Sequence, residues 1–185
     1  RLDASDNAVT LTAAQFASVA AGGPLFVAGD VITVSMSNAA DVFADLGAAH
    51  AAAGQETVKF TNGTASSWAF ADVAGAALAN TDTFTGLGNI DKVTGFASGT
   101  DKIDLTAFAL SGVSTDAQFG ASNTKVGDGE YKVVIGDFAA GVFTVNAAGA
   151  DTLVVWDGNT NAASVTMVGV VLVGTNTVTT ADLIV

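Results

Sequence analysis

The residues best suited to chemistry in this 185-residue chain are its aspartates, because only Glu56 and Glu130 among 18 acidic residues are glutamates. Aspartate favours turns, and its carboxylate oxygens are ligands that calcium prefers. Asp82, Asp91, Asp101 and Asp104 are spaced so that carboxylates from adjacent turns meet if the intervening strands stack. This spacing predicts a calcium site. The competing interpretation is that Asp101 and Asp104 only begin turns.

A second group of side-chain oxygens follows in the run Asp-Gly-Asn-Thr-Asn. Its first, third and fifth positions are Asp157, Asn159 and Asn161, an alternation also found in calcium loops. The position where an EF-hand carries its last acidic ligand is Val168, so the run is not an EF-hand. A plain hairpin turn explains the run as well, and this is the preferred interpretation.

No catalytic constellation accompanies these acids. The sequence has no cysteine and a single histidine, His50, which lies in an apolar pattern at helical spacing. Thiolate nucleophiles and two-histidine zinc sites are therefore excluded. The nucleophile elbow, the P-loop and the dinucleotide-binding glycine motif do not occur in the sequence. The sequence predicts a protein that is not an enzyme.

The balance of charge and apolar residues excludes two classes of partner. Six basic residues face 18 acidic ones, for a formal net charge of -12, and nucleic acid needs clustered basic side chains. Half of the residues are apolar, but no uninterrupted apolar run approaches the roughly 20 residues of a membrane-spanning helix. The chain opens at Arg1 without a Sec-type signal, which favours a piece of a longer protein.

The elements that would position the aspartates are mainly short strands. Apolar and polar residues alternate over 9–16, 30–37 and 56–61, which predicts strands, whereas 38–53 has the spacing and end signals of a helix. Further short strands are predicted at 92–96, 102–105, 131–135, 142–145, 152–156, 164–168 and 170–173. The predicted fold is mainly β, a sandwich or rolled sheet of short strands with one or two helices in the N-terminal third.

The change of pattern near Thr81 divides the chain into two parts. Residues 1–80 mix strands and helix, and residues 81–185 form a β part. The two parts are either separate or share one compact unit.

The second part resembles a known family. The stretch 90–108, IDKVTGFASGTDKIDLTAF, is similar to the segment that follows the glycine-rich repeats of RTX proteins, best known from serralysin-type proteases. Gly95 stands where that family usually has Asp, so one cation ligand is missing. The glycine-rich nonapeptide itself is nearly absent, which argues against a full β-roll of stacked calcium ions.

The end of the chain resembles the same family. Residues 151–173 are similar to its closing hairpin, and the last four residues, Asp182, Leu183, Ile184 and Val185, are similar to its uncleaved C-terminal export signal. The resemblance covers about residues 81–185. It implies export through type I secretion machinery, calcium as the cofactor, and a secreted or cell-surface location.

The function expected from this resemblance is that of a noncatalytic C-terminal region, which carries the export signal and folds on calcium outside the cell. The alternative is a part of a self-assembling surface-layer subunit or adhesin, which contacts itself or other surface proteins. The composition, rich in Ala, Thr and Gly, favours the alternative, and the four terminal residues favour export.

Overall fold

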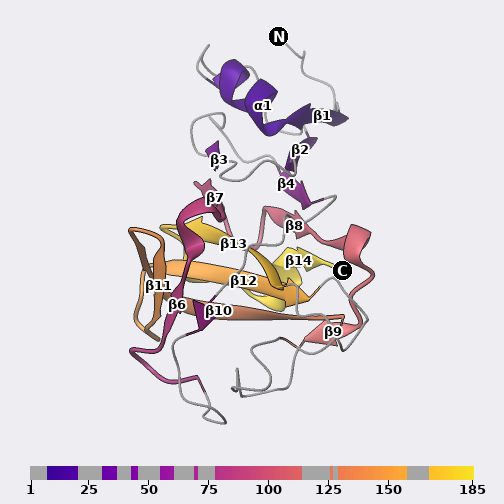
Figure 1. Cartoon of the computed structure of the whole chain (residues 1–185). Coiled ribbons are helices and arrows are strands. Elements are labelled where there is room, and N and C mark those ends of the chain that lie inside the picture. Colours follow the sequence, from indigo (N-terminus) through magenta and orange to yellow (C-terminus); the bar gives the residue numbers. More distant parts are fainter. Residues whose placement is uncertain are drawn as a thin grey trace.

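The protein is mainly β, built from two sheets that pack against each other (Figure 1). The structure is a computed structural model, and it describes residues 8–20, 31–36, 43–45, 55–60, 69–70, 78–113, 126, 129–157 and 167–185. The predicted fold class is confirmed. The one helix of at least two turns in the described ranges is α1 (Ala13–Ala20), and three single 3-10 turns are η1 (Leu87–Asn89), η2 (Thr106–Phe108) and η3 (Thr180–Asp182).

The first sheet is parallel throughout. Its five described strands lie in the order β1 (Ala8–Thr12), β2 (Val31–Met36), β4 (Gln55–Phe60), β8 (Lys102–Asp104) and β14 (Leu183–Ile184). Each neighbouring pair runs in the same direction. The sheet therefore joins residues from both ends of the chain.

The second sheet is mixed. Its strands follow the order β3 (Phe43–Asp45), β7 (Asp91–Thr94), β13 (Met167–Val173), β12 (Asp151–Asp157), β10 (Glu130–Ala139), β11 (Val142–Val145), β6 (Thr83–Thr85) and β5 (Ala69–Phe70), with β9 (Gly112–Val113) beside β10. The pairs β3–β7 and β7–β13 are parallel. From β13 onward, each strand is antiparallel to the next strand in the order given, as far as β5. An antiparallel meander is thus attached to a parallel half.

Parallel strands alternate between the two sheets along the chain. β2, β3 and β4 lie in the first, second and first sheet, β7 is followed by β8, and β13 is followed by β14. The chain therefore winds repeatedly from one sheet to the other, with longer antiparallel excursions between the turns (Figure 1). No sequence period predicted this winding.

Two apolar clusters hold the sheets. Between the sheets, Ile32, Val58 and Ile103 of the parallel sheet pack in one cluster with Val154 and Trp156 of β12. Leu153 and Val155 of β12 belong to the second cluster. β12 is thus covered on both faces, and all seven of its residues are buried. Residues before and after position 80 share both sheets and the first cluster.

Most predicted strands are present, but two N-terminal expectations were wrong. Residues 43–45, expected inside a helix, form strand β3 beside β7, while the other residues of 38–53 lie outside the described ranges. Residues 13–16, expected to continue a strand, begin α1. There the Thr12 hydroxyl accepts a hydrogen bond from the Gln15 amide and the Gln15 side chain accepts one from the Thr12 amide, a capping box.

Candidate functional site

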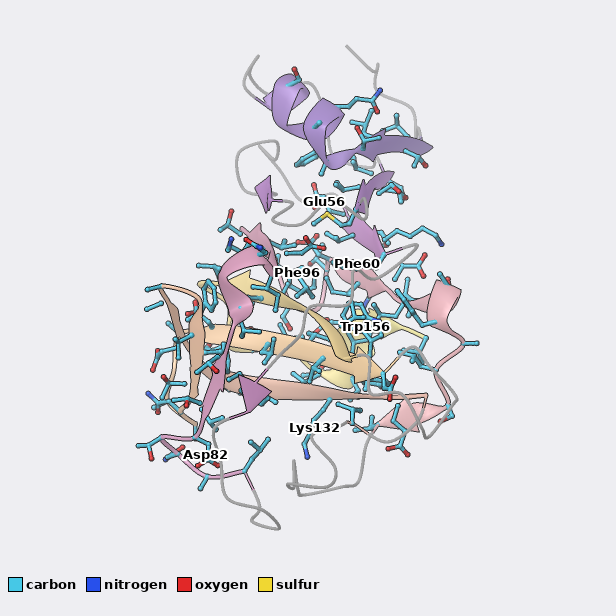
Figure 2. All side chains as sticks on the ribbon, in the orientation of Figure 1. Glu56, Phe60, Asp82, Phe96, Lys132 and Trp156 are labelled. Carbon is cyan, nitrogen blue, oxygen red and sulfur yellow. The ribbon has the colours of Figure 1, made fainter. Side chains whose placement is uncertain are left out.

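The stretch that resembles RTX proteins forms a tight connection between the two sheets. β7 ends at Thr94, and Gly95 follows with a φ of 70°, a left-handed conformation that glycine adopts without strain. A turn over 98–100 then leads to Asp101 and into β8. Phe96 points from this connection into the core, as Figure 2 shows. Glycine at position 95 thus suits the left-handed backbone of this connection.

Asp101 closes this turn and is almost completely buried. One carboxylate oxygen accepts a hydrogen bond from the Ala97 amide at 2.7 Å, and the other accepts one from the Glu56 amide at 3.1 Å. The first bond lies within the turn, whereas the second reaches across to the neighbouring strand β4. Asp101 therefore ends its turn, whereas the competing interpretation expected it to begin one, and it also ties the turn to β4.

Glu56 is the partner that sequence reasoning missed. It lies on β4, its side chain is 2 % exposed, and it hydrogen-bonds the Asp101 carboxyl group. Burial, then the hydrogen bond with Asp101 and the negative charge of that group, raise the pKa of Glu56 to about 9. The Glu56 carboxyl thus keeps its proton at neutral pH. The sequence did hold a signal, because Glu56 alternates with Val58 and Phe60, which both face the core.

Asp104, at the end of β8, is held by other donors. The Lys59 ammonium group donates to one carboxylate oxygen at 2.6 Å, and the amide and hydroxyl of Thr106 donate to the other at 3.0 and 2.6 Å. Partial burial alone would raise the pKa of Asp104, but these hydrogen bonds and the Lys59 charge outweigh it and lower the pKa. Asp104 is therefore an ion-pair partner across the parallel sheet.

Asp82 and Asp91 lie elsewhere. Asp82 accepts a hydrogen bond from the Ala79 amide at 2.5 Å, and its backbone carbonyl accepts one from Val145 at 2.7 Å. In Figure 2 it lies at the opposite end of the molecule from Glu56, and so away from Asp101. Asp91 is the half-buried first residue of β7, in register with Val170 of β13. The structure brings Asp101 beside Glu56 and leaves Asp82 far from that pair.

The second predicted group is described only in part. Asp157 ends β12, is fully buried, and is in register with Met167 of β13. The antiparallel pairing of β12 with β13 is that of a hairpin. Asn159 and Asn161 lie outside the described residues.

These positions can be compared with what calcium coordination needs. Calcium takes six to eight oxygen ligands. Within the described ranges, no three His, Cys, Asp or Glu side chains gather to hold an ion. Both oxygens of Asp101 and both of Asp104 already accept hydrogen bonds from protein donors. The described residues thus hold no assembled calcium cage, and calcium binding by Asp82, Asp91, Asp101 and Asp104 stays a prediction.

The four terminal residues are part of the fold. Asp182 closes η3 and is 1 % exposed, and Thr179 and Asp182 form a reciprocal capping box. Leu183 is buried in the core between the sheets, and β14 pairs in parallel with β8. Ile184 and Val185 are 40 % and 47 % exposed. The predicted signal thus lies against the stretch 90–108.

Asp182 is the centre of this contact. Its oxygens accept hydrogen bonds from the Gly99 amide at 2.7 Å, the Ser98 hydroxyl at 2.9 Å, and the amide and hydroxyl of Thr179 at 2.8 and 3.2 Å. Burial opposes the charge of Asp182, but the hydrogen bonds outweigh burial and lower the pKa. An ionised, buried carboxylate joins the chain end to the turn after β7.

A shallow depression lies on another part of the surface. It has a volume of about 340 Å³ and is lined by Leu78, Asn80, Val145 and residues 132–135 of β10, with Lys132 at the lower end of the molecule in Figure 2. None of the predicted cation ligands is among its described lining residues. It gives no support to the predicted site.

Comparisons with models of known protein families and with curated proteins give no match to the chain. In the part of the chain that is described, no helix is long and apolar enough to cross a membrane.

Proposed function

We propose that the chain is the noncatalytic C-terminal region of a bacterial protein exported by type I secretion machinery, with the export signal in its last four residues. One observation carries the proposal. The two stretches that resemble RTX proteins, residues 90–108 and the chain end, bond to each other directly through Ser98, Gly99 and Asp182. Two separate stretches that resemble one family thus fall in one structural unit.

Export by this signal is tested by removing it. We expect that deletion of residues 182–185 abolishes export of the chain from cells that carry a type I channel. Because the deletion also removes β14 and destabilises the fold, the matched control is Trp156→Ala, which disrupts the core and leaves the chain end intact. Normal export of the deleted chain would contradict the signal assignment, whatever the control does.

Folding on calcium outside the cell is the second part of the proposal. The net charge of -12 makes the compact state repel itself, and cations that bind only the folded state would offset this repulsion. Calcium is scarce in the cytosol and abundant outside, so folding would follow export. This part is supported by the charge and by the family resemblance, and not by an assembled ligand cage.

Circular dichroism tests the role of calcium. We expect that EDTA lowers the melting temperature and reduces the β signal, that added calcium restores both, and that magnesium at the same ionic strength restores less. Equal restoration by sodium at matched ionic strength would indicate charge screening alone. Melting that is the same in EDTA and in calcium would remove this part of the proposal.

The alternative, a surface-layer subunit or adhesin, is favoured by a different observation. Among the described strands β14 pairs with β8 alone, and Ile184 and Val185 are exposed there. An exposed strand edge with apolar side chains can pair with another chain. Light scattering that shows assembly of the natural chain, but not of Ile184→Lys/Val185→Lys, would favour this alternative.

A further inference from the structure

The C-terminal segment, defined as residues 179–185, is positioned by a set of contacts that the unfolded chain cannot have. Asp182 accepts hydrogen bonds from Ser98 and Gly99, which lie 84 and 83 residues earlier in the sequence. The Lys102 ammonium group donates to the Ala181 carbonyl oxygen at 2.9 Å, across 79 residues. Contacts over such separations form only when the chain between them has folded.

The side chains and backbone of the segment are both covered by these contacts. Asp182 is 1 % exposed and Leu183 is 8 % exposed, so half of the terminal tetrapeptide is buried. The Ile184 carbonyl oxygen accepts a hydrogen bond from the Leu105 amide at 2.7 Å, within the pairing of β14 with β8. A receptor that reads this tetrapeptide as an extended peptide would find its acidic and first apolar side chains inaccessible.

We infer that folding makes the export signal inaccessible. Because Asp182 and Leu183 are buried in the folded chain, the secretion machinery can bind the C-terminal segment only in the unfolded chain. The inference rests on the proposed function, since it assigns a regulation to the proposed signal. The exposed fraction of the signal falls by the folding equilibrium constant, which is roughly a thousand-fold or more for an ordinary domain. A chain that folds before export is therefore no longer a substrate, and a chain that folds after export does not re-engage the channel.

Carboxypeptidase digestion of the whole chain tests the inference. For the folded chain, we expect release of Val185 first, and release of Ile184 and Leu183, which form β14, at least about ten-fold slower than from the urea-unfolded chain. Release of Leu183 at the same rate from both states would overturn the inference.

Variants on the partner side of the contact sharpen this test. Ser98→Ala/Lys102→Ala removes two donors to the segment and leaves the tetrapeptide unchanged, so we expect faster release of Leu183. The matched control is Lys132→Ala on β10, at a distance from the chain end in Figure 1 and Figure 2, for which we expect no change. Equal rates for the double variant and the natural chain would contradict docking through these donors.

Export of the same variants separates this inference from the proposed function. Because Ser98→Ala/Lys102→Ala only weakens the contacts that hold the C-terminal segment, we expect export at least as efficient as that of the natural chain. If deletion of residues 182–185 leaves export unchanged, the proposed function fails, even where Leu183 is protected. If the deletion abolishes export but Leu183 is unprotected in the folded chain, the signal stands and its withdrawal by folding is refuted.

Discussion

The parallel sheet and the antiparallel part of the second sheet, here called the meander, are held together by different kinds of buried side chain. In the meander, β10, β11, β12 and β13 pair mostly with strands next to them in the chain. The middle of β12, Thr152 to Trp156, is buried and mostly apolar, and its two buried aspartates, Asp151 and Asp157, lie at the ends of the strand. In the parallel sheet, buried carboxyl groups at Glu56, Asp101 and Asp182 link strands and turns that are 45 to 84 residues apart.

The difference has an energetic consequence. Apolar burial in the meander depends little on pH, whereas a buried carboxyl group contributes according to its protonation state and its donors. A parallel sheet also needs long connections, so its strands meet late and at a larger entropic cost. We expect the parallel sheet, with the chain end docked on it, to respond first to changes of pH and charge.

The strongest test of the comparison is at the residue where the two regions meet. Trp156 of β12 is fully buried, and its ring lies 5.4 Å from that of Phe60 on β4 and 5.3 Å from that of Phe108. We expect Trp156→Ala to lower the free energy of unfolding by about 3–5 kcal/mol in urea titrations, and Trp156→Phe to lower it by much less. If both sheets depend on this contact, a single unfolding transition follows. Two separate transitions in the natural chain would show that the regions are independent.

A second test uses the proton of Glu56. The folded chain keeps this proton up to a pKa of about 9, whereas the unfolded chain releases it near 4.5. Between these pH values the folded state binds more protons than the unfolded state. The stability that the Glu56 proton contributes to the folded state is therefore complete below pH 4.5 and is lost as the pH rises through about 9.

Glu56→Gln removes this pH dependence and keeps a side chain that can donate to Asp101. In the natural chain we expect stability to fall by up to about 1.4 kcal/mol per pH unit over this range, and in the variant we expect a flatter profile. Glu130→Gln, a change at the other glutamate, is the control. The same slope in all three proteins, measured by urea unfolding at several pH values, would contradict the assignment.

A third test concerns the charge of Asp182. Its lowered pKa means that its stabilisation is present above its ordinary value of 3.8 and is lost as the pH falls through the folded value. We expect Asp182→Asn to cost about 2 kcal/mol at neutral pH, because one of the replaced oxygens becomes an NH₂ group that faces protein donors. In strong acid the difference between the two proteins should disappear. Asp137→Asn, at an exposed carboxylate of β10 that accepts hydrogen bonds from Asn146 and Ala150, should cost less than Asp182→Asn, because water can replace the lost bonds.

The smallest expected effect is at the ion pair of Lys59 with Asp104. The Lys59 and Asp104 side chains are 35 % and 13 % exposed, so water and salt screen the pair. We expect Lys59→Met, which keeps an apolar stem, to cost no more than about 1 kcal/mol, and the loss to shrink in high salt. A double-mutant cycle with Asp104→Asn measures the coupling. A loss that is unchanged by salt would indicate packing of the Lys59 stem.

The sequence by itself determined those strands whose pattern of apolar and polar residues lies within the strand. The short β-like runs at 142–145 and 152–156, bounded by Gly, Asn and Asp, predicted β11 and most of β12. The alternation over 30–37 and 56–61 predicted β2 and β4 nearly residue by residue. A two-residue period marks a strand with one covered face wherever it occurs, because successive side chains point to opposite sides. The absence of cysteine and the charge of -12 likewise follow from composition alone.

Tertiary structure alone decided which strands became neighbours. The apolar residues around Phe43–Asp45 have the spacing of a helix, but these three residues form a strand because they pair with the edge of β7. The buried Glu56 meets a partner only because β8 brings Asp101 beside it, and the buried Asp182 meets donors only because Ser98 and Gly99 lie next to it. These partners lie 45 to 84 residues away, beyond the reach of any local period, so only the packed chain determines which carboxyl groups meet a donor.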